Sequence, residues 1–345
     1  MLVALVACAS VGAAVIWLLK RRRDRSLKWC TVKNKRINGQ VALITGANSG
    51  LGFETAVALS SMGATVVLAC RDVAAGKAAC ECIAVRLKTV NTFDDSRARL
   101  HVMELDLASL RSVAEFAAEF RTKFTRLDIL VNNAGVMRSP FTRSGDGVEL
   151  HFAVNHLGHF HLTNLLSELL ANTKRSRIVI VSSGHYKNRS NYAELSADGV
   201  FDDVAGDPLR ARGDGDYDAL AAYARSKLAN CLHAFALADR DRSCNVYAVR
   251  PGFVRGTRLG RHVSPVLRLL AAPLIWFFSR TIEQGVQTIL HCCLVDTDQL
   301  TSGALYSDCE LEEYDDTLVN ARRANQLWQL SCSLVSDATN KMHSA

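Results

Sequence analysis

The chain has 345 residues, of which 49% are hydrophobic and 22% charged, ordinary values for a globular protein with a large core in one or two domains. Its formal net charge of +7 comes from one basic block between Lys20 and Arg36, so the charge does not indicate a nucleic-acid partner. The 11 cysteines include no Cys-x-x-Cys pair, which favours reduced, buried thiols in a cytosol-facing domain and gives no metal site.

The first segment in chain order is Leu2–Leu19, an uncharged apolar run of 18 residues at the lower limit for spanning a bilayer. A cleaved signal peptide is the alternative, but it would need basic residues before the run and a small-residue cleavage site. Here the basic cluster follows the run, which places the downstream side in the cytosol. We therefore predict a transmembrane anchor at residues 1–19 and a basic linker at 20–40, in an endomembrane such as the endoplasmic reticulum.

Short apolar strands then alternate with amphipathic helices. Strands are predicted at Val41–Ile44, Thr65–Ala69, Leu100–Glu104, Ile129–Val131, Ile178–Val181 and Val246–Val249, and helices at Phe53–Met62, Ser109–Phe124, His156–Leu170 and Tyr223–Ala238. This alternation is typical of a parallel sheet covered on both faces. The predicted fold class is α/β, a doubly wound parallel sheet forming a single domain over 41–335, followed by a tail at 336–345. The polar stretch Asn188–Asp218 is predicted to be a long loop.

A glycine-rich turn connects the first strand to the first helix, where Thr45–Gly52 contains three glycines. Glycines allow a tight turn and a close approach of backbone to ligand, and the helix N-terminus offers N–H groups to a diphosphate. A merely structural turn is the alternative, because the spacing is not Gly-x-Gly-x-x-Gly. The predicted cofactor-binding residues of this turn are Gly46, Asn48, Ser49, Gly50, Leu51 and Gly52.

The end of the second strand indicates which dinucleotide is bound. An acidic residue about 20 positions beyond the glycine turn normally binds the ribose hydroxyls of NAD. Cys70 stands near that position and Arg71 follows it. Because a guanidinium can bind a 2′-phosphate, the sequence favours NADP(H) over NAD(H). The alternative is that Arg71 is a solvated charge, and Asp72 beside it weakens the argument.

Tyr223 and Lys227 lie four residues apart in an apolar-rich run, so they share one face of a helix. A neighbouring ammonium favours phenolate and would bring the pKa of a phenol down from about 10. Such a tyrosine can act as an acid or base in alcohol and carbonyl chemistry. Taken alone, the two residues could also be an ordinary surface pair.

Several segments then occur in an order typical of one family. They are Thr45–Gly52, Asp106-Leu107, Asn132–Gly135, Asn155–Gly158, Val181–Ser183, Tyr223–Lys227 and Arg250–Gly252. Over about Gln40–Val335 the chain resembles the short-chain dehydrogenase/reductase family, which implies a Rossmann-type fold. Ala69–Asp72, Phe152–Phe160 and the N-terminal anchor resemble the membrane-anchored retinol dehydrogenase branch of that family.

The resemblance implies a role for each matching residue. Tyr223 would exchange the proton at the substrate oxygen, and Lys227 would lower its pKa and bind the nicotinamide ribose. Ser183, in preference to Ser182, would hydrogen-bond the carbonyl oxygen, and Asn155 would kink its helix and hold a relay water. The remaining implied positions are Asp106, Leu107, Asn133, Ala134, Gly135, Pro251, Gly252 and Val254 for the cofactor and Phe253 for the substrate.

Two of these segments have an alternative interpretation, and the chain departs from the family pattern in two places. Asp106 could be an ordinary helix cap, and Asn132–Gly135 a strand-end turn. Ser183 and Tyr223 are 40 residues apart, longer than the family norm, which could reshape the substrate entrance. Gly256 stands where a Thr or Ser usually contacts the nicotinamide amide, and Thr257 lies one residue later.

The apolar span Val263–Phe278 lies within the expected substrate lid at 253–280 and suits a lipophilic substrate. It could equally be core or dock on a membrane surface. The sequence thus predicts an NADP(H)-dependent enzyme interconverting a lipophilic alcohol and its carbonyl, with retinol/retinal favoured over a sterol, polyprenol or fatty aldehyde. A homodimer is the expected assembly. The alternatives are a steroid or xenobiotic carbonyl reductase, or a non-catalytic cofactor-binding membrane scaffold.

Overall fold

The computed structural model describes residues 17–24, 26–30, 32, 35–89, 99–188, 217–257 and 272–344. Within these ranges eight strands form one sheet in the order β3-β2-β1-β4-β5-β6-β7-β8. Neighbouring strands from β3 to β7 are parallel, while β8 runs antiparallel to β7. The predicted parallel sheet is therefore confirmed for its main part and carries one antiparallel strand at its edge.

The strands predicted from apolar runs are β1 to β6, and each boundary lies within one residue of the prediction. The strands are β1 (Val41–Thr45), β2 (Thr65–Cys70), β3 (Leu100–Glu104), β4 (Ile129–Asn132), β5 (Arg177–Val181), β6 (Asn245–Arg250), β7 (Leu305–Ser307) and β8 (Glu310–Glu312). The longer helices are α2 (Gly50–Ser61), α3 (Val73–Thr89), α4 (Leu110–Lys123), α6 (Gly158–Leu165), α9 (Ala219–Arg240), α13 (Gln287–Leu294) and α14 (Ala321–Ser344). Shorter ones are α5 (Leu150–Phe152), α7 (Ser167–Asn172), α11 (Ala272–Phe278) and α12 (Ile282–Gly285).

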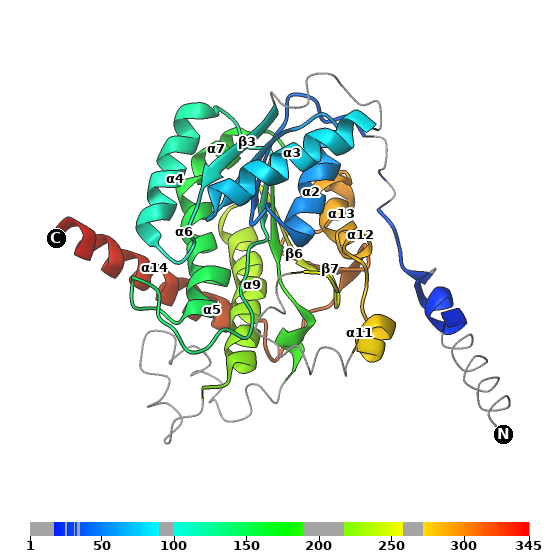
Figure 1. Ribbon diagram of the computed structural model, residues 1–345. Helices are drawn as coiled ribbons and strands as arrows, with labels where there is room; N and C mark the ends of the chain where they lie inside the picture. The colour runs from blue at the N-terminus through cyan, green and yellow to red at the C-terminus, as the bar shows by residue number, and fades with distance from the viewer. Residues whose placement is uncertain are drawn as a thin grey trace.

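The sheet is buried on both faces, as Figure 1 shows by the helices on either side of it. Successive residues of a strand point to opposite faces. Leu43 and Val67 therefore join a core cluster with α4, α6, α9 and α14, whereas Ile44 and Leu68 join a second cluster with α2, α3 and α13. Burial on both sides explains why the strands are continuous apolar runs in the sequence.

The helix expected at His156–Leu170 is interrupted. A π-helical turn, η2 (Ala153–Leu157), precedes α6, and α7 follows after a break at Leu166. At the other end of the chain, α14 continues from Ala321 to Ser344 and so crosses the expected domain boundary at residue 335.

The N-terminal region is described only in part. No helix among the described residues is long and apolar enough to cross a membrane. Residues 1–16, which form most of the expected anchor, lie outside those residues, and residues 17–24 are helical. Residues 189–216 of the expected loop and 258–271 of the expected lid also lie outside the described part of the chain.

The topology gathers the predicted site residues at one edge of the sheet. In a doubly wound sheet, ligands bind outside the carboxyl ends of the strands, where the strand order reverses, here between β1 and β4. The residues at or just beyond these carboxyl ends are Thr45, Arg71, Asp106, Asn133, Ser183 and Pro251, which follow β1 to β6 in turn.

Candidate active site

Helix α9 carries Tyr223 and Lys227, and both side chains are buried. Lys227 Nζ lies 5.8 Å from the centre of the Tyr223 ring. The same ammonium donates to the Val181 carbonyl at 2.9 Å, and Asn230 Nδ2 donates to that carbonyl at 3.0 Å. The end of β5 thus fixes the ammonium beside the phenol.

Burial dominates the electrostatics of this pair. It raises the pKa of Tyr223 to about 12, although a hydrogen bond with Ser183 acts in the opposite direction. Burial also lowers the pKa of Lys227 to about 8. Lys227 was expected to lower the pKa of the phenol, but the net shift is upward because burial disfavours the phenolate.

The two serines after β5 have different partners. The Ser183 side chain hydrogen-bonds Tyr223 and lies 3.2 Å from His185 Nδ1. Ser182 Oγ instead donates to the Lys227 carbonyl at 2.7 Å and accepts from the Cys231 thiol at 3.2 Å. Ser183 is therefore the serine beside the phenol, while Ser182 ties β5 to the backbone of α9.

Asn155 lies in the π-helical turn, where a kink was expected. Its amide nitrogen donates to the Val136 carbonyl at 3.0 Å and to Ser226 Oγ at 2.8 Å, and its Oδ1 accepts from the Val136 N–H at 2.8 Å. Ser226 in turn donates to the Tyr223 carbonyl at 2.7 Å. The buried Asn155 amide therefore joins the segment after β4 to the helix that carries the phenol.

Thr45 and His159, for which the sequence suggested no role, connect the glycine turn to Asn155. Thr45 Oγ1 accepts from the N–H groups of Asn133 at 2.9 Å and Ala134 at 3.0 Å, and it lies 2.8 Å from His159 Nε2. His159 Nδ1 lies 3.0 Å from the Asn155 carbonyl. A carbonyl only accepts, so Nδ1 carries the hydrogen and Nε2 accepts from the Thr45 hydroxyl. Burial lowers the pKa of His159 to about 4, which keeps this tautomer neutral.

The glycine turn is shaped to hold backbone close to a ligand. Gly50 has φ +59°, a conformation that favours glycine. A Cβ on Gly52 would lie 2.5 Å from Asn133 Nδ2 and 2.6 Å from the Gly46 carbonyl, so no larger residue fits there. Ser49 precedes α2 without capping it through its side chain. The first N–H groups of α2 are thus suited to an anionic ligand such as a diphosphate.

The end of β2 carries the residues expected to select the cofactor. The Cys70 thiol is buried against the backbone N–H groups of Asn48 and Ala47, and Arg71 is exposed. Asp72 Oδ1 accepts from the Ala75 N–H at 2.9 Å, at the start of α3. Asp72 weakened the expectation of NADP(H), and its carboxylate accepts a hydrogen bond at the N-terminus of α3.

The segment after β6 returns to the glycine turn. Gly256 has φ +81°, which explains why glycine stands where a Thr or Ser was expected. The next residue, Thr257, lies against the glycine turn: a Cβ on Gly50 would lie 3.6 Å from Thr257 Cγ2. Val254 pairs with Arg280, and Phe253 is 54% exposed.

The segments after β3 and β4 complete the edge. Asp106 Oδ1 accepts from the Ala108 N–H at 3.0 Å, so its carboxylate shapes the turn before α4. Leu107 is buried. A Cβ on Gly135 would lie 3.2 Å from Asn155 Oδ1 and 3.7 Å from Lys227 Nζ, which places Gly135 against both side chains.

A buried acid–histidine pair adjoins the phenol and was also missed by sequence reasoning. His151 Nδ1 lies 2.7 Å from Glu149 Oε1, and Tyr217 donates to the same oxygen at 2.6 Å. Burial would raise the pKa of Glu149, but the hydrogen bonds from His151 and Tyr217 outweigh it and lower the pKa. The His151 ring centre lies 6.4 Å from that of Tyr223.

Comparison with known proteins identifies the family. The short chain dehydrogenase family model matches residues 40–194. Retinol dehydrogenase 14 of Mus musculus is 39% identical over 94% of this chain and 98% of its own length. The chain belongs to the short-chain dehydrogenase/reductase family, in its retinol dehydrogenase-like branch. Retinol dehydrogenase 12 of Homo sapiens is likewise 39% identical, over 88% of each chain.

Solved structures agree with this assignment. An uncharacterized protein from Mycobacterium Paratuberculosis matches with a TM-score of 0.64 and 28% identity over 90% of this chain and 98% of its own. Salutaridine reductase from Papaver somniferum shares the fold, with a TM-score of 0.57 and 24% identity over 78% and 99% of the two chains. The resemblance seen in the sequence is confirmed, and membership of this family makes the protein an NAD(P)-binding oxidoreductase that acts on CH–OH groups.

Proposed function

We propose that this protein is a membrane-anchored, NADP(H)-preferring oxidoreductase that interconverts a lipophilic alcohol and its aldehyde or ketone, with retinol/retinal as the favoured pair. The observation that carries the proposal is the placement of Ser183 and Lys227 beside the buried Tyr223, with Asn155 joined to the same helix through Ser226. The relatives named retinol dehydrogenases support the choice of substrate.

The residues around the substrate oxygen have separate tasks. When bound, the nicotinamide cofactor supplies or takes the hydride. Hydride transfer to a carbonyl builds negative charge on its oxygen, and hydroxyl donors held in place there stabilise that charge. Ser183 would position the oxygen, and Tyr223 would donate the proton. With a pKa of about 12, Tyr223 is protonated at neutral pH, which suits carbonyl reduction.

The glycine turn and the β4 end fit a dinucleotide. Gly52 leaves no room for a side chain, so backbone can approach the diphosphate. Lys227 Nζ, close to Gly135, would hold the nicotinamide ribose. Asn133, Ala134 and the turn at Asp106 would line the adenine side.

The preference for NADP(H) rests on the end of β2. Arg71 is exposed there, Cys70 replaces the acid typical of NAD binding, and the Asp72 carboxylate is engaged by the first turn of α3. A 2′-phosphate would therefore meet the Arg71 guanidinium, while Asp72 Oδ1 accepts from the Ala75 N–H.

The proposed location follows from the uncharged run Leu2–Leu19 and the basic residues after it. They support an anchor in the endoplasmic reticulum membrane with the catalytic domain on the cytosolic side. A lipophilic substrate dissolved in the same bilayer would be close to the enzyme. The homodimer expected from the sequence stays a prediction.

The test is NADPH consumption by the full chain in detergent micelles with all-trans-retinal. Tyr223→Phe should lower kcat by about 100-fold or more, since proton transfer by a positioned group contributes about 10²–10⁴, while NADPH still binds. Ser183→Ala should lower kcat strongly, and Ser182→Ala serves as its matched control. Absence of turnover on retinal, steroid and other apolar carbonyls, with NADPH bound normally, would support the scaffold instead.

A further inference from the structure

Helix α11 is an apolar helix that contributes nothing to the core. All seven of its residues are apolar, from Ala272 to Phe278, and none is buried. Leu274 is 64% exposed and Phe278 61% exposed. Large apolar side chains gathered on a surface usually mark a contact with a partner or a membrane.

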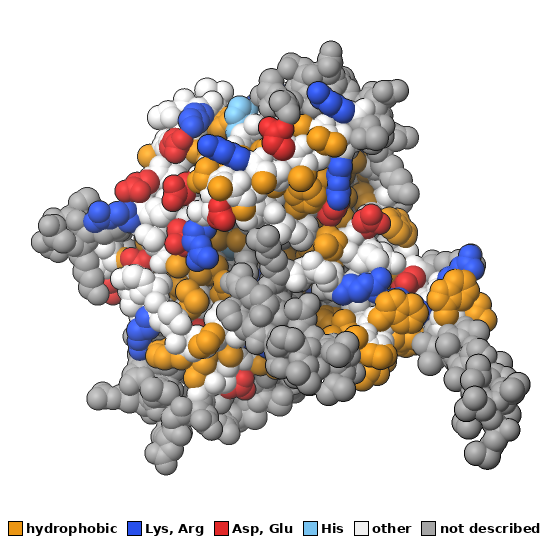
Figure 2. Space-filling model, viewed as in Figure 1, with side chains coloured by type: hydrophobic (Ala, Val, Ile, Leu, Met, Phe, Trp, Pro, Cys, Tyr) orange, Lys and Arg blue, Asp and Glu red, His pale blue; other side chains and the backbone are white. Residues whose placement is uncertain are grey.

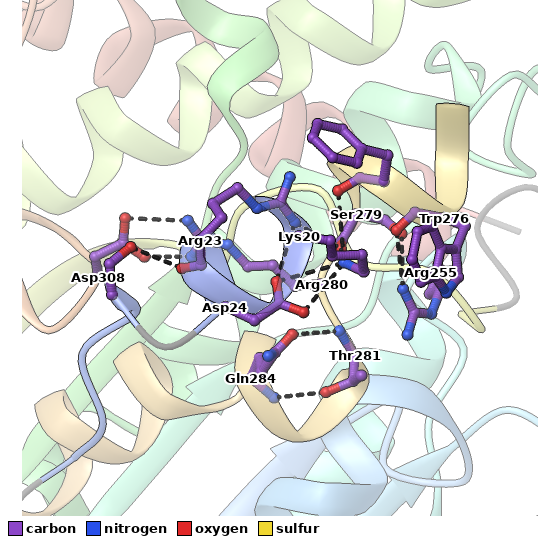
Figure 3. A network of polar contacts seen from close by, with 12 residues as sticks. Lys20, Arg23, Asp24, Arg255, Trp276, Ser279, Arg280, Thr281, Gln284 and Asp308 are labelled. Carbon is purple, nitrogen blue, oxygen red and sulfur yellow. Dashed lines mark hydrogen bonds and ion pairs between the residues drawn. The ribbon is translucent and has the colours of Figure 1, made fainter. Parts of the chain in front are cut away.

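The carboxyl end of α11 is held by cations from two other segments, as Figure 3 shows. Lys20 Nζ donates to the Ser279 carbonyl at 3.2 Å, and Arg23 donates to the same oxygen at 3.1 Å. Arg255 donates to the Trp276 carbonyl at 3.2 Å. Cations at the carboxyl end of a helix satisfy its free carbonyls and its dipole. The position of α11 is thus fixed by its polar end, while its apolar sides stay exposed.

These contacts join α11 to the N-terminal helix at residues 17–24. The Lys20 ammonium lies 5.3 Å from the centre of the Trp276 ring, and the Arg23 guanidinium lies 5.7 Å from that of Phe277. The Lys20 side chain is only 5% exposed, unusual for a lysine in a segment whose neighbours are exposed. The two helices therefore present one surface.

That surface combines apolar and basic side chains. Trp17, Leu18 and Leu19 are each about half exposed, and Arg21 and Arg22 next to them are exposed. Figure 2 shows hydrophobic side chains beside Lys and Arg where the N-terminal helix meets α11. We call Trp17–Arg22 together with α11 the basic apolar face.

We propose that the basic apolar face lies in the headgroup region of a lipid bilayer, so that α11 is a second membrane contact beside the anchor. Two observations favour lipid over a second copy of the chain. The face continues directly into the uncharged residues 2–16. It also carries Arg21 and Arg22, which suit headgroup phosphates, whereas pairing of this face with its own copy would bring four like charges into one interface.

The proposal deepens the proposed function, on which it rests for the bilayer and the lipophilic substrate. Residues 252–257 pack against the segment that follows α11: the Arg280 N–H donates to the Phe253 carbonyl at 2.7 Å, and a Cβ on Gly252 would lie 2.8 Å from the Arg280 guanidinium. Docking α11 on lipid would therefore bring the nicotinamide side of the site to the membrane surface.

The test uses the four tryptophans of the full chain, Trp17, Trp29, Trp276 and Trp328. Three chains, each retaining one tryptophan at 17, 276 or 328 with the others replaced by phenylalanine, are reconstituted into vesicles of brominated phosphatidylcholine. Trp328 is the control, because it lies on α14, across the domain from α11, against Phe160 and Arg240. Circular dichroism and NADPH binding show that each chain is folded.

The expected result is a loss of fluorescence at Trp17 and Trp276 and unchanged emission at Trp328. Quenching at Trp17 without quenching at Trp276 would overturn the proposal while leaving the anchor intact, and would point to a second copy or another protein on α11. No quenching at either position would overturn both. Retinal reduction by the unmodified chain in micelles is measured separately, so failure of the enzyme assignment is distinguished from failure of the docking surface.

Discussion

Replacing Thr45 by valine removes one hydroxyl and leaves the shape of the side chain nearly unchanged. The hydroxyl accepts from the Ala134 and Asn133 N–H groups and donates to His159 Nε2. The Asn133 N–H also bonds the Val131 carbonyl at 3.0 Å, so it keeps a partner in the variant. Ala134 N–H and His159 Nε2 are left unsatisfied. A buried unsatisfied group costs about 1–3 kcal/mol, so the loss at the buried His159 should lower the free energy of unfolding by about 1–3 kcal/mol, and the partly buried Ala134 N–H adds to it.

Such a loss is measurable, because domains are stable by only about 5–15 kcal/mol. The measurement is urea unfolding of the full chain in micelles, followed by tryptophan fluorescence, together with an NADPH titration. Thr45→Ser keeps the hydroxyl and loses one methyl, so it should cost about 1 kcal/mol and leave the Kd for NADPH nearly unchanged. Thr45→Val should raise that Kd, because Asn133 and Ala134 lose their common acceptor. If the valine and serine variants unfold at the same urea concentration and bind NADPH equally, the Thr45 hydroxyl does not hold the Ala134 N–H and His159 in the way described.

Three further outcomes are expected. Arg71→Ala should raise the Kd for NADPH by about 10- to 100-fold, because a charge-assisted hydrogen bond contributes about 1.5–3 kcal/mol. The Kd for NADH should change little, and an equal loss of affinity for both cofactors contradicts a contact with the 2′-phosphate. Thr257, which lies near Gly50, should lose one hydrogen bond to the cofactor when it is replaced by alanine. Because one hydrogen bond contributes about 1 kcal/mol, Thr257→Ala should raise the Kd for both cofactors by about five-fold, and unchanged titrations would exclude a contact between Thr257 and the cofactor. Burial lowers the pKa of His159 to about 4 and of His233 to about 3 from an ordinary 6.5, so the unfolded chain binds more protons below pH 6.5. The stabilisation from keeping these histidines neutral is fully present above pH 6.5. Below about pH 6 the free energy of unfolding should fall by about 1 kcal/mol per histidine for each pH unit. A urea midpoint that stays constant from pH 6.5 to 5 would contradict this expectation.

Much of the sheet was predictable because burial on both faces leaves a local pattern. The strands β1 to β6 are short apolar runs bounded by turns, and each was placed within one residue. The three-residue strands β7 and β8 are too short to show a period, so nothing local indicates them. The π turn lies where the resemblance implied a kink at Asn155, whereas the break at Leu166 between α6 and α7 was not predicted.

The site was predictable where a residue type carries its own chemistry, as with the glycine turn and the Tyr223–Lys227 spacing. Thr45 and His159 carry no such signal, because a threonine at a strand end and a histidine in an apolar helix are common. Their contact exists only because β1 and α6 meet across the sheet edge. The predicted direction of the pKa shift of Tyr223 was wrong for a related reason. The four-residue spacing reveals the neighbouring ammonium, but it does not reveal how deeply the phenol is buried.

The π turn at Ala153–Leu157 makes the length of this segment as important as its residue types. An α-helix advances by about 100° per residue, so a one-residue deletion there would turn every later side chain of α6 by that angle relative to the sheet. The shortened chain would form a more regular helix, yet His159 would leave Thr45. A deletion that improves the local secondary structure would thus separate the cofactor side of the site from its proton-transfer side.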